Sequence, residues 1–201
     1  IEYRLSGEAP YPAAIQDCKC AVRYLRANAE RLGVAPMRIG AAGGSAGGHL
    51  SAILATTPGL AEWEGDGGDA GHSSAIQAAV IFNGEFDLPA WWRYGKCNDL
   101  MREFLRKEYE QDPALFRQAS PITHVTSRTP PCLLIHGEED VPVPIQQSVE
   151  FYERLRAAGV SAELVREPGV GHAWFNHDPH FEPNLRRMME FLVKWLGSTT
   201  G

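Results

Sequence analysis

The sequence predicts an α/β fold, in which helices cover a mainly parallel, doubly wound β-sheet. Short apolar segments of strand length alternate with longer segments that carry apolar residues at helical spacing. Two strand-like segments, 75–82 and 131–135, are apolar over nearly their whole length, as expected for strands buried on both faces. The 201 residues are 44% hydrophobic and 22% charged, which fits one globular domain, residues 1–201, with a sizeable core.

The first part of the chain is expected to contain two strands and a helix. Residues 1–5 are predicted to be the end of a strand. A long helix should begin at Pro12, since apolar residues recur at helical spacing after it, and should end at Gly33. A short strand is expected at 38–42.

The middle of the chain is expected to be more irregular. Residues 43–48 form a glycine-rich turn, and a helix of small residues follows from 49 to about 56. Residues 64–74 are rich in Gly and Asp, which indicates a surface loop. The segment at about 88–118 has a helix-like charge pattern and is interpreted as a small cap-like insertion rather than part of the sheet.

The last part returns to the alternation of strands and helices. The buried strand at 131–135 precedes a helix at 145–155, and a strand at 162–166 precedes a last helix at 185–195. No apolar run approaches the roughly 20 residues that a membrane-spanning helix needs. The four cysteines, which are expected to be free thiols, are Cys18, Cys20, Cys97 and Cys132. A disulfide involving Cys97 is left open.

Ser45 is the predicted nucleophile. It is the serine of a Gly-x-Ser-x-Gly sequence at 43–47, placed between a predicted strand and a predicted helix, as a nucleophile elbow requires. Gly43 and Gly47 are expected to remove steric clashes around this sharp turn, and Gly48 to let the helix approach the sheet. The alternative is an ordinary glycine-rich turn with a helix-capping serine.

A serine hydroxyl needs a base, and the base needs an orienting acid, each in a loop after a later strand. Asp140 is the predicted acid, because it lies furthest into the loop after the strand at 131–135 and just before two prolines. Glu138 and Glu139 remain alternatives.

His172 is the predicted base, since it follows the last strand in a loop with flanking glycines. The other histidines fit this role less well: His49 and His136 are expected to be packed in the interior, and His72 and His124 to lie in loops. No metal site is expected, because the spacing of His177, Asp178 and His180 fits no standard site.

With these residues placed, the chain resembles the acetyl-esterase and feruloyl-esterase-like branch of the α/β-hydrolases, which is related to the hormone-sensitive-lipase group. The matching segments run nearly from end to end: 3–5, 11–17, 43–50, 83–88, 119–122, 135–140 and 171–172. The resemblance implies a carboxylic ester hydrolase that acts on acetyl, other short acyl or hydroxycinnamoyl esters of sugars or plant polysaccharides. No metal or organic cofactor is expected.

The expected mechanism is acyl transfer through Ser45, with the backbone N–H of Ala46 as one oxyanion donor. Trp91 and Trp92 are candidates for lining a sugar or alcohol site. They are equally candidates for the core of the insertion.

One motif of the resembled family is absent, namely a His-Gly-Gly-type oxyanion loop that precedes the strand ending at 1–5 in relatives. We therefore expect an N-terminal part with the first strands to precede this chain. An inner strand between residues 5 and 43 is also missing, so we expect the sheet to rearrange, or a homodimer or a bound N-terminal fragment to fill the gap. The compartment is left open: secretion or a periplasmic location would require a signal peptide in that part.

The net charge of −6 argues against nucleic-acid binding and gives no attraction to anionic membranes. The expected partner is a small-molecule or carbohydrate ester. Two other functions are left open. A prolyl-oligopeptidase-like serine peptidase is disfavoured by the small Ala46 and the short chain, and an inactive hydrolase fragment or interaction domain would retain the same residues without turnover.

Overall fold

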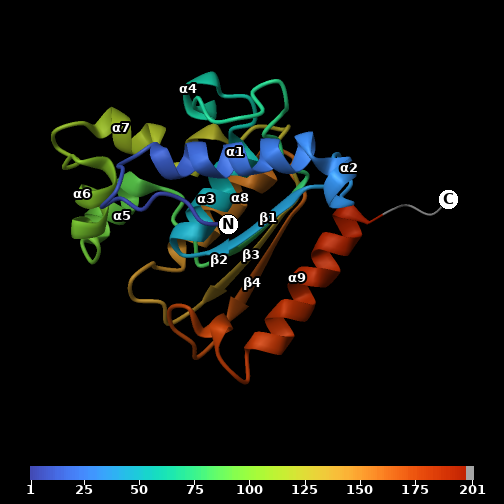
Figure 1. The fold of residues 1–201 in the computed structure, drawn as a ribbon. Coiled ribbons are helices and arrows are strands. Elements are labelled where there is room, and N and C mark those ends of the chain that lie inside the picture. Colours follow the sequence, from blue (N-terminus) through green and yellow to red (C-terminus); the bar gives the residue numbers. More distant parts are fainter. Residues whose placement is uncertain (198–201) are drawn as a thin grey trace.

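The computed structural model describes residues 1–197 and contains a four-stranded, wholly parallel sheet in the order β1-β2-β3-β4 (Figure 1). The strands are β1 (Gly40–Gly44), β2 (Ala78–Phe82), β3 (Cys132–Gly137) and β4 (Ala162–Glu167). The predicted α/β class with a parallel sheet is thus confirmed.

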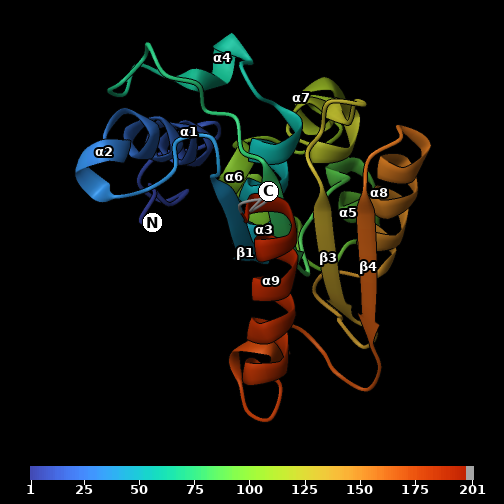
Figure 2. The same cartoon turned by 90° about the vertical axis from the view of Figure 1, so that its right-hand side faces the viewer.

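Helices connect the strands and cover both faces of the sheet. They are α1 (Ala13–Ala27), α2 (Ala29–Leu32), α3 (Ala46–Thr56), α4 (Ala61–Glu64), α5 (Leu88–Tyr94), α6 (Asn98–Leu105), α7 (Pro113–Gln118), α8 (Gln146–Ala157) and α9 (Phe181–Leu196). Helices α1, α3 and α8 lie on one side of the sheet and α9 on the other (Figure 1). The turned view shows α8 beside β4 (Figure 2).

Alternate residues of the central strands supply the two cores. Ala79 and Ile81 of β2 pack with α1, α3 and α8, whereas Val80 and Phe82 pack with α9. All residues of β2 and β3 are buried, because each has a strand on both sides and a helix layer on both faces.

Residues 1–5 do not form a strand, contrary to the prediction. A strand needs a neighbouring strand to receive its backbone groups, and this segment lies against α1 instead. There the guanidinium and backbone N–H of Arg4 bind the carboxylate of Asp17, with an Nη2–Oδ1 distance of 2.7 Å.

Other boundaries differ slightly from the predictions. The long helix is interrupted at Asn28, so that α2 is a separate turn that ends at Gly33, whose φ is 66°. β1 begins two residues later than predicted. Helix α3 begins at Ala46, directly after Ser45, rather than at His49.

The segment at 88–118 forms the helices α5, α6 and α7, which pack around a small hydrophobic cluster that also includes Val143 of the loop after β3. Trp91, Met101 and Phe116 are buried in this core. Asp87 and Asp112 accept hydrogen bonds from backbone N–H groups in the first turns of α5 and α7, which fixes where these two helices begin.

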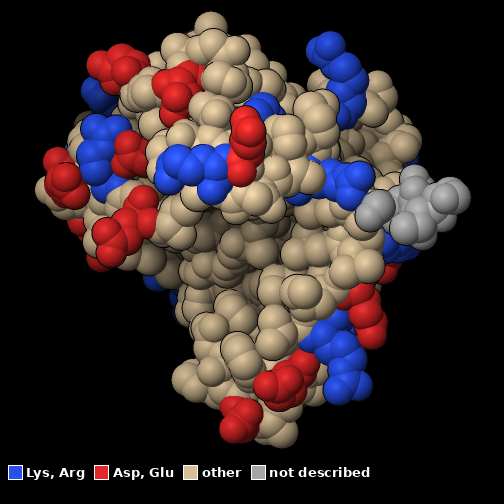
Figure 3. Space-filling view, turned by 45° about the vertical axis from the view of Figure 1, so that its right-hand side comes forward, with Lys and Arg blue, Asp and Glu red and all other residues tan. Residues whose placement is uncertain are grey.

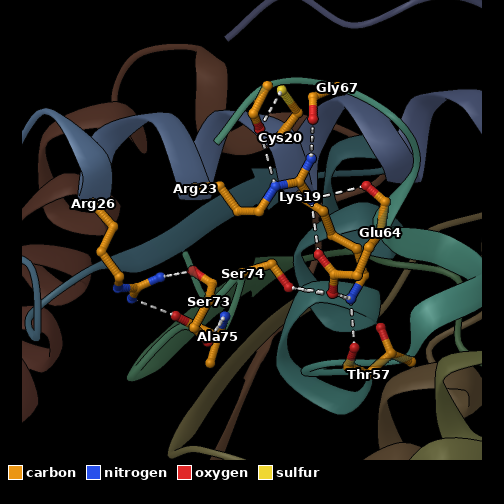
Figure 4. Close-up of polar contacts among 11 residues, drawn as sticks. Lys19, Cys20, Arg23, Arg26, Thr57, Glu64, Gly67, Ser73, Ser74 and Ala75 are labelled. Atoms are coloured by element: carbon orange, nitrogen blue, oxygen red, sulfur yellow. Dashed lines mark hydrogen bonds and ion pairs between the residues drawn. The ribbon is translucent and has the colours of Figure 1, made fainter. Parts of the chain in front are cut away.

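The segment at 57–75 is fastened to α1 by buried cations (Figure 4). Lys19 and Arg23, 0% and 2% exposed, both pair with Glu64 at 3.0 and 2.8 Å. One turn further along α1, Arg26 donates to the backbone carbonyls of Ser73 and Ala75. Polar side chains thus hold a loop that has few apolar residues.

Within the described residues, β1 pairs with β2 on one side and has no strand on its other side. Gly40 and Ala42 are exposed there. A space-filling view shows a hollow of uncharged residues on this face, between the row of charges over α1 and the charged side chains near α9 (Figure 3).

Over residues 1–197, no helix combines the length and apolar character that crossing a membrane requires. All four cysteines are free thiols, so the disulfide left open for Cys97 is not formed. Its Sγ instead lies 3.6 Å from the carbonyl oxygen of Pro142.

Candidate active site

The candidate active site lies at the carboxyl edge of the sheet, where all four parallel strands end (Figure 1). Ser45 follows β1, Asp140 follows β3 and His172 follows β4. In open parallel sheets this edge is the usual place for a ligand site, because the loops there converge.

Ser45 has a strained backbone, with φ 55° and ψ −124°. A non-glycine residue in such a conformation costs about 1–3 kcal/mol, which the surrounding structure must offset. Part of that support is the Ser45 N–H, which donates to the carbonyl oxygen of Phe82 at 3.0 Å. The turn places the Oγ atom at the N-terminal end of α3.

Close backbone packing explains two of the glycines around Ser45. A Cβ on Gly43 would lie 2.3 Å from the carbonyl oxygen of Gly47, and one on Gly48 would lie 2.8 Å from that of Phe82. The expectation for Gly47 itself was wrong, since a Cβ there would meet nothing within 4 Å. Gly47 matters through its backbone, which fills the space beside Gly43.

His172 connects the serine to the acid. Its Nε2 lies 3.0 Å from Ser45 Oγ, and its Nδ1 lies 2.7 Å from Asp140 Oδ2. Since a carboxylate only accepts hydrogen bonds, Nδ1 carries the proton, and Nε2 is left to accept from the serine hydroxyl. The structure therefore brings the three predicted residues together in the order that general-base catalysis needs.

The loops of Asp140 and His172 meet because their backbones approach closely. The N–H of Glu139 donates to the carbonyl of Val170 at 3.0 Å, and a Cβ on Gly137 would lie 2.4 Å from that same oxygen. Glycine at 137 is thus required for the two loops to pack.

Asp140 has a fully buried carboxylate, whereas Glu138 and Glu139 are exposed and do not reach His172. Burial by itself would raise the pKa of Asp140, but hydrogen bonds from His136, His172 and the Val143 N–H outweigh it and hold the pKa below its usual range. The acid is therefore ionised at neutral pH.

The hydrogen bond to Asp140 raises the pKa of His172, although partial burial opposes this effect. The interior histidines are as expected: His49 binds the carbonyl of Ala119 at 2.8 Å, and His136 lies between Ser148 Oγ and the carbonyl of Val143. Burial lowers the pKa of His49 to about 4.

A cavity of about 300 Å³ opens beside Ser45. Residues 3–6, the start of α3 and the insertion form its mainly apolar walls. Ala46 lines the cavity as the first residue of α3, and the first N–H groups of a helix have no partner within it. The Ala46 N–H is therefore placed to serve a ligand.

The two tryptophans differ in their placement. Trp91 lines the cavity, and its Nε1 donates to the Pro142 carbonyl at 2.8 Å. Trp92 does not line it: its ring packs edge-on against Phe116 and its Nε1 donates to Glu110. Trp92 is part of the insertion's core, so its assignment as a substrate contact is corrected.

Two residues at the site were not singled out from the sequence. Asn83 is fully buried with φ 36°, and its Nδ2 lies 3.3 Å from His172 Nδ1. Glu85 is 5% exposed, and its Oε1 lies 3.4 Å from Ser45 Oγ. The available signal was that both follow a fully buried strand, at the same edge as Ser45.

Within residues 1–197, His, Cys, Asp and Glu side chains form no group of three or more that could hold a metal ion. The polar and charged side chains that line the cavity include those of Ser45, Glu85 and Arg4.

The parallel sheet with helices on both faces, together with an elbow serine at its carboxyl edge, defines an α/β-hydrolase of the esterase type, within the group related to hormone-sensitive lipase. The sequence matches the BD-FAE family over residues 1–155, and the chain belongs to that family. The resemblance stated from the sequence is thereby confirmed.

Individual relatives agree with this assignment. Esterase LipC of Mycobacterium tuberculosis is 35% identical over 180 residues, which are 87% of this chain and 44% of LipC. A truncated carbohydrate esterase from gut microbiota superposes with a TM-score of 0.85 at 30% identity, over 96% of this chain and 73% of that one. The propionate-bound esterase Est2 of Thermogutta terrifontis gives a TM-score of 0.81 at 31% identity, over 100% of this chain and 72% of Est2. The chain thus spans less than half the length of LipC.

Proposed function

We propose that this chain is the catalytic part of a serine esterase that hydrolyses carboxylic esters through an acyl-enzyme. The observation that carries the proposal is the continuous set of hydrogen bonds from Ser45 through His172 to the buried carboxylate of Asp140. This arrangement turns a weak hydroxyl nucleophile into a reactive one.

In the first step, Ser45 Oγ attacks the ester carbonyl carbon while its proton passes to His172 Nε2. The tetrahedral oxyanion accepts a hydrogen bond from the Ala46 N–H, and Asp140 stabilises the imidazolium. Collapse then breaks the bond to the alcohol oxygen, which takes the proton from His172. Water, deprotonated by His172, attacks the acyl-enzyme and releases the acid in the same way.

The substrates we propose are short acyl esters, acetyl above all, or hydroxycinnamoyl esters of a sugar or plant polysaccharide. The similar proteins named as a carbohydrate esterase and as a propionate-bound esterase support this choice. The cavity of about 300 Å³ lies at the lower end of the usual range for ligand pockets. Turnover should therefore decline from acetyl and butyryl towards palmitoyl p-nitrophenyl esters.

We also propose that a second copy of this chain or a bound N-terminal segment covers the free edge of β1 in the active protein. Its exposed residues and one-sided pairing support this proposal. A strand edge left open pairs readily with another chain.

The decisive experiment uses Ser45→Ala together with a fluorophosphonate probe. The wild type should hydrolyse p-nitrophenyl acetate and become labelled at Ser45, whereas the variant should do neither and keep the same circular dichroism spectrum. Undiminished turnover by Ser45→Ala would reject the proposal, and a folded wild type with neither turnover nor labelling would favour an inactive domain.

A further inference from the structure

Glu85 is a buried acid that the mechanism above does not use. Its side chain lines the same cavity as Ser45, and Oε1 lies 3.4 Å from Oγ. A buried acid in a mainly apolar wall costs stability, and buried titratable groups in a cleft next to a nucleophile are candidates for a functional role.

The segment that carries Glu85 is fixed on both sides. Gln147, itself buried, accepts from the N–H groups of Phe86 and Asp87 at 2.8 Å each. The next N–H, of Leu88, donates to Ser120 Oγ at 2.9 Å. The carboxyl group is therefore held beside Ser45 by the fold rather than by a flexible loop.

The position of Glu85 relative to Oγ decides what it can touch. In the tetrahedral intermediate, the oxyanion and the alcohol oxygen are bonded to the same carbon as Oγ. A group 3.4 Å from Oγ that faces the cavity is within hydrogen-bond reach of such an oxygen.

Burial raises the pKa of Glu85 to about 7, although its own backbone N–H and the nearby His172 act in the opposite direction. A bound ester excludes more water and an oxyanion adds negative charge, and both favour the protonated form, whereas the imidazolium of His172 in the same intermediate favours the ionised form. The titratable and charged groups around the cavity or acting on Glu85 are Tyr3, Arg4, His49, Cys97, Glu103, Asp140 and His172.

We propose that Glu85 is a catalytic residue which, as a neutral carboxylic acid, donates a hydrogen bond to the oxyanion of the tetrahedral intermediate alongside the Ala46 N–H. This inference rests on the proposed esterase function. The proton stays on Glu85 throughout, so the bonds made and broken are those already described. A protonated carboxyl in an apolar site is known to serve an oxyanion in this way in another enzyme.

An ionised Glu85 cannot donate a hydrogen bond, and its negative charge would repel the neighbouring oxyanion. The value of kcat/KM should therefore fall on the alkaline side as Glu85 loses its proton, and on the acid side as His172 gains one. The resulting pH profile is bell-shaped. Because the two groups interact, the apparent pKa values of its two limbs belong to the pair rather than to either residue alone.

The test compares Glu85→Gln and Glu85→Leu with the wild type, using p-nitrophenyl acetate from pH 5 to 9 and Ser45→Ala as the blank. The Gln amide offers an N–H that does not titrate, so Glu85→Gln should stay within about tenfold of wild type and lose the alkaline decline. Glu85→Leu offers no donor and should lose roughly 10²–10³ in kcat, the loss measured for one oxyanion donor in a protease. Glu150→Gln, the same change at an exposed position of α8, should leave the profile as in wild type.

Equal activity of the Gln and Leu variants, or an alkaline decline that persists in Glu85→Gln, would overturn the role of Glu85 while leaving the esterase function intact. A wild type without turnover would overturn both. If Glu85→Leu fails to fold, as circular dichroism would show, the pH profile of Glu85→Gln decides alone.

Discussion

At the scale of single residues, the orientation of Asp140 is set by a backbone group. The N–H of Val143 donates to Oδ1 at 2.8 Å, which leaves Oδ2 to face His172. His136 Nε2 lies 3.4 Å from the same Oδ2 and also contacts the Val143 carbonyl oxygen. The His136 ring therefore links the carboxylate to the backbone of its own loop.

This arrangement predicts the effect of Asp140→Asn. The Val143 N–H should retain the amide oxygen, so the amide NH₂ would face His172 and force Nδ1 to accept. The proton would then sit on Nε2, which could no longer take the proton of Ser45. We expect kcat to fall by about 10⁴, the loss that this change causes in a serine protease, with little change in KM. A loss below tenfold in steady-state kinetics would contradict the assigned role of Asp140.

The acid limb of the pH profile follows from the same pair. Asp140 raises the pKa of His172, and His172 acts as a base only when neutral. The value of kcat/KM should therefore decline as the pH falls through a value above the ordinary histidine pKa of about 6.5. Rates between pH 5 and 8 would measure this, and a flat profile would exclude His172 as the base.

At the scale of elements, α1 and the loop at 57–75 depend on Glu64. Its carboxylate is the shared partner of the buried Lys19 and Arg23, and it also accepts from Ser74 at 2.6 Å. Burial lowers the pKa of Lys19, which shows that its charge is costly without that partner.

Glu64→Gln should accordingly lower the free energy of unfolding by about 3 kcal/mol, the low end for breaking a buried pair, since Glu64 itself is partly exposed. Chemical denaturation would measure the change. Glu62→Gln, on the exposed side of α4, is the matched control and should behave like wild type. Equal stability of the two variants would show that the cations do not need Glu64.

At the scale of the whole molecule, β1 and β4 are the two edge strands of the described sheet. Of these two, only β1 leads directly into the nucleophile turn. We expect the chain alone to dimerise through this edge, with an apparent mass in light scattering that rises with concentration. Ala42→Lys places a charge on the edge and should return the protein to monomers.

Ala35→Lys, at an exposed loop position, should not affect association. Hydrogen exchange adds a second measurement, because pairing at the free edge would protect those amides of 40–44 that do not already bond β2. A chain that stays monomeric at all concentrations would contradict self-association.

Much of the fold and the positions of the three central residues could be predicted because their signals are local. Ser45, Asp140 and His172 each follow a strand-like apolar run, and Gly43 marks the turn. Residues 1–5 were misjudged because a strand exists only with a partner, which sequence pattern does not reveal. The role of Glu85 depends on a distance across 40 residues of chain, and no local pattern encodes it.

The separation of Ser45 and His172 by 127 positions has a consequence for how the protein folds. Contacts between distant parts of a chain form late, because the intervening loops must close first. The clustered tryptophans of α5, by contrast, bury themselves mainly against near neighbours such as Met101 and Phe116. During refolding, burial of these two tryptophans would then precede the return of turnover, and that return would time the final docking of the C-terminal strand and its loop.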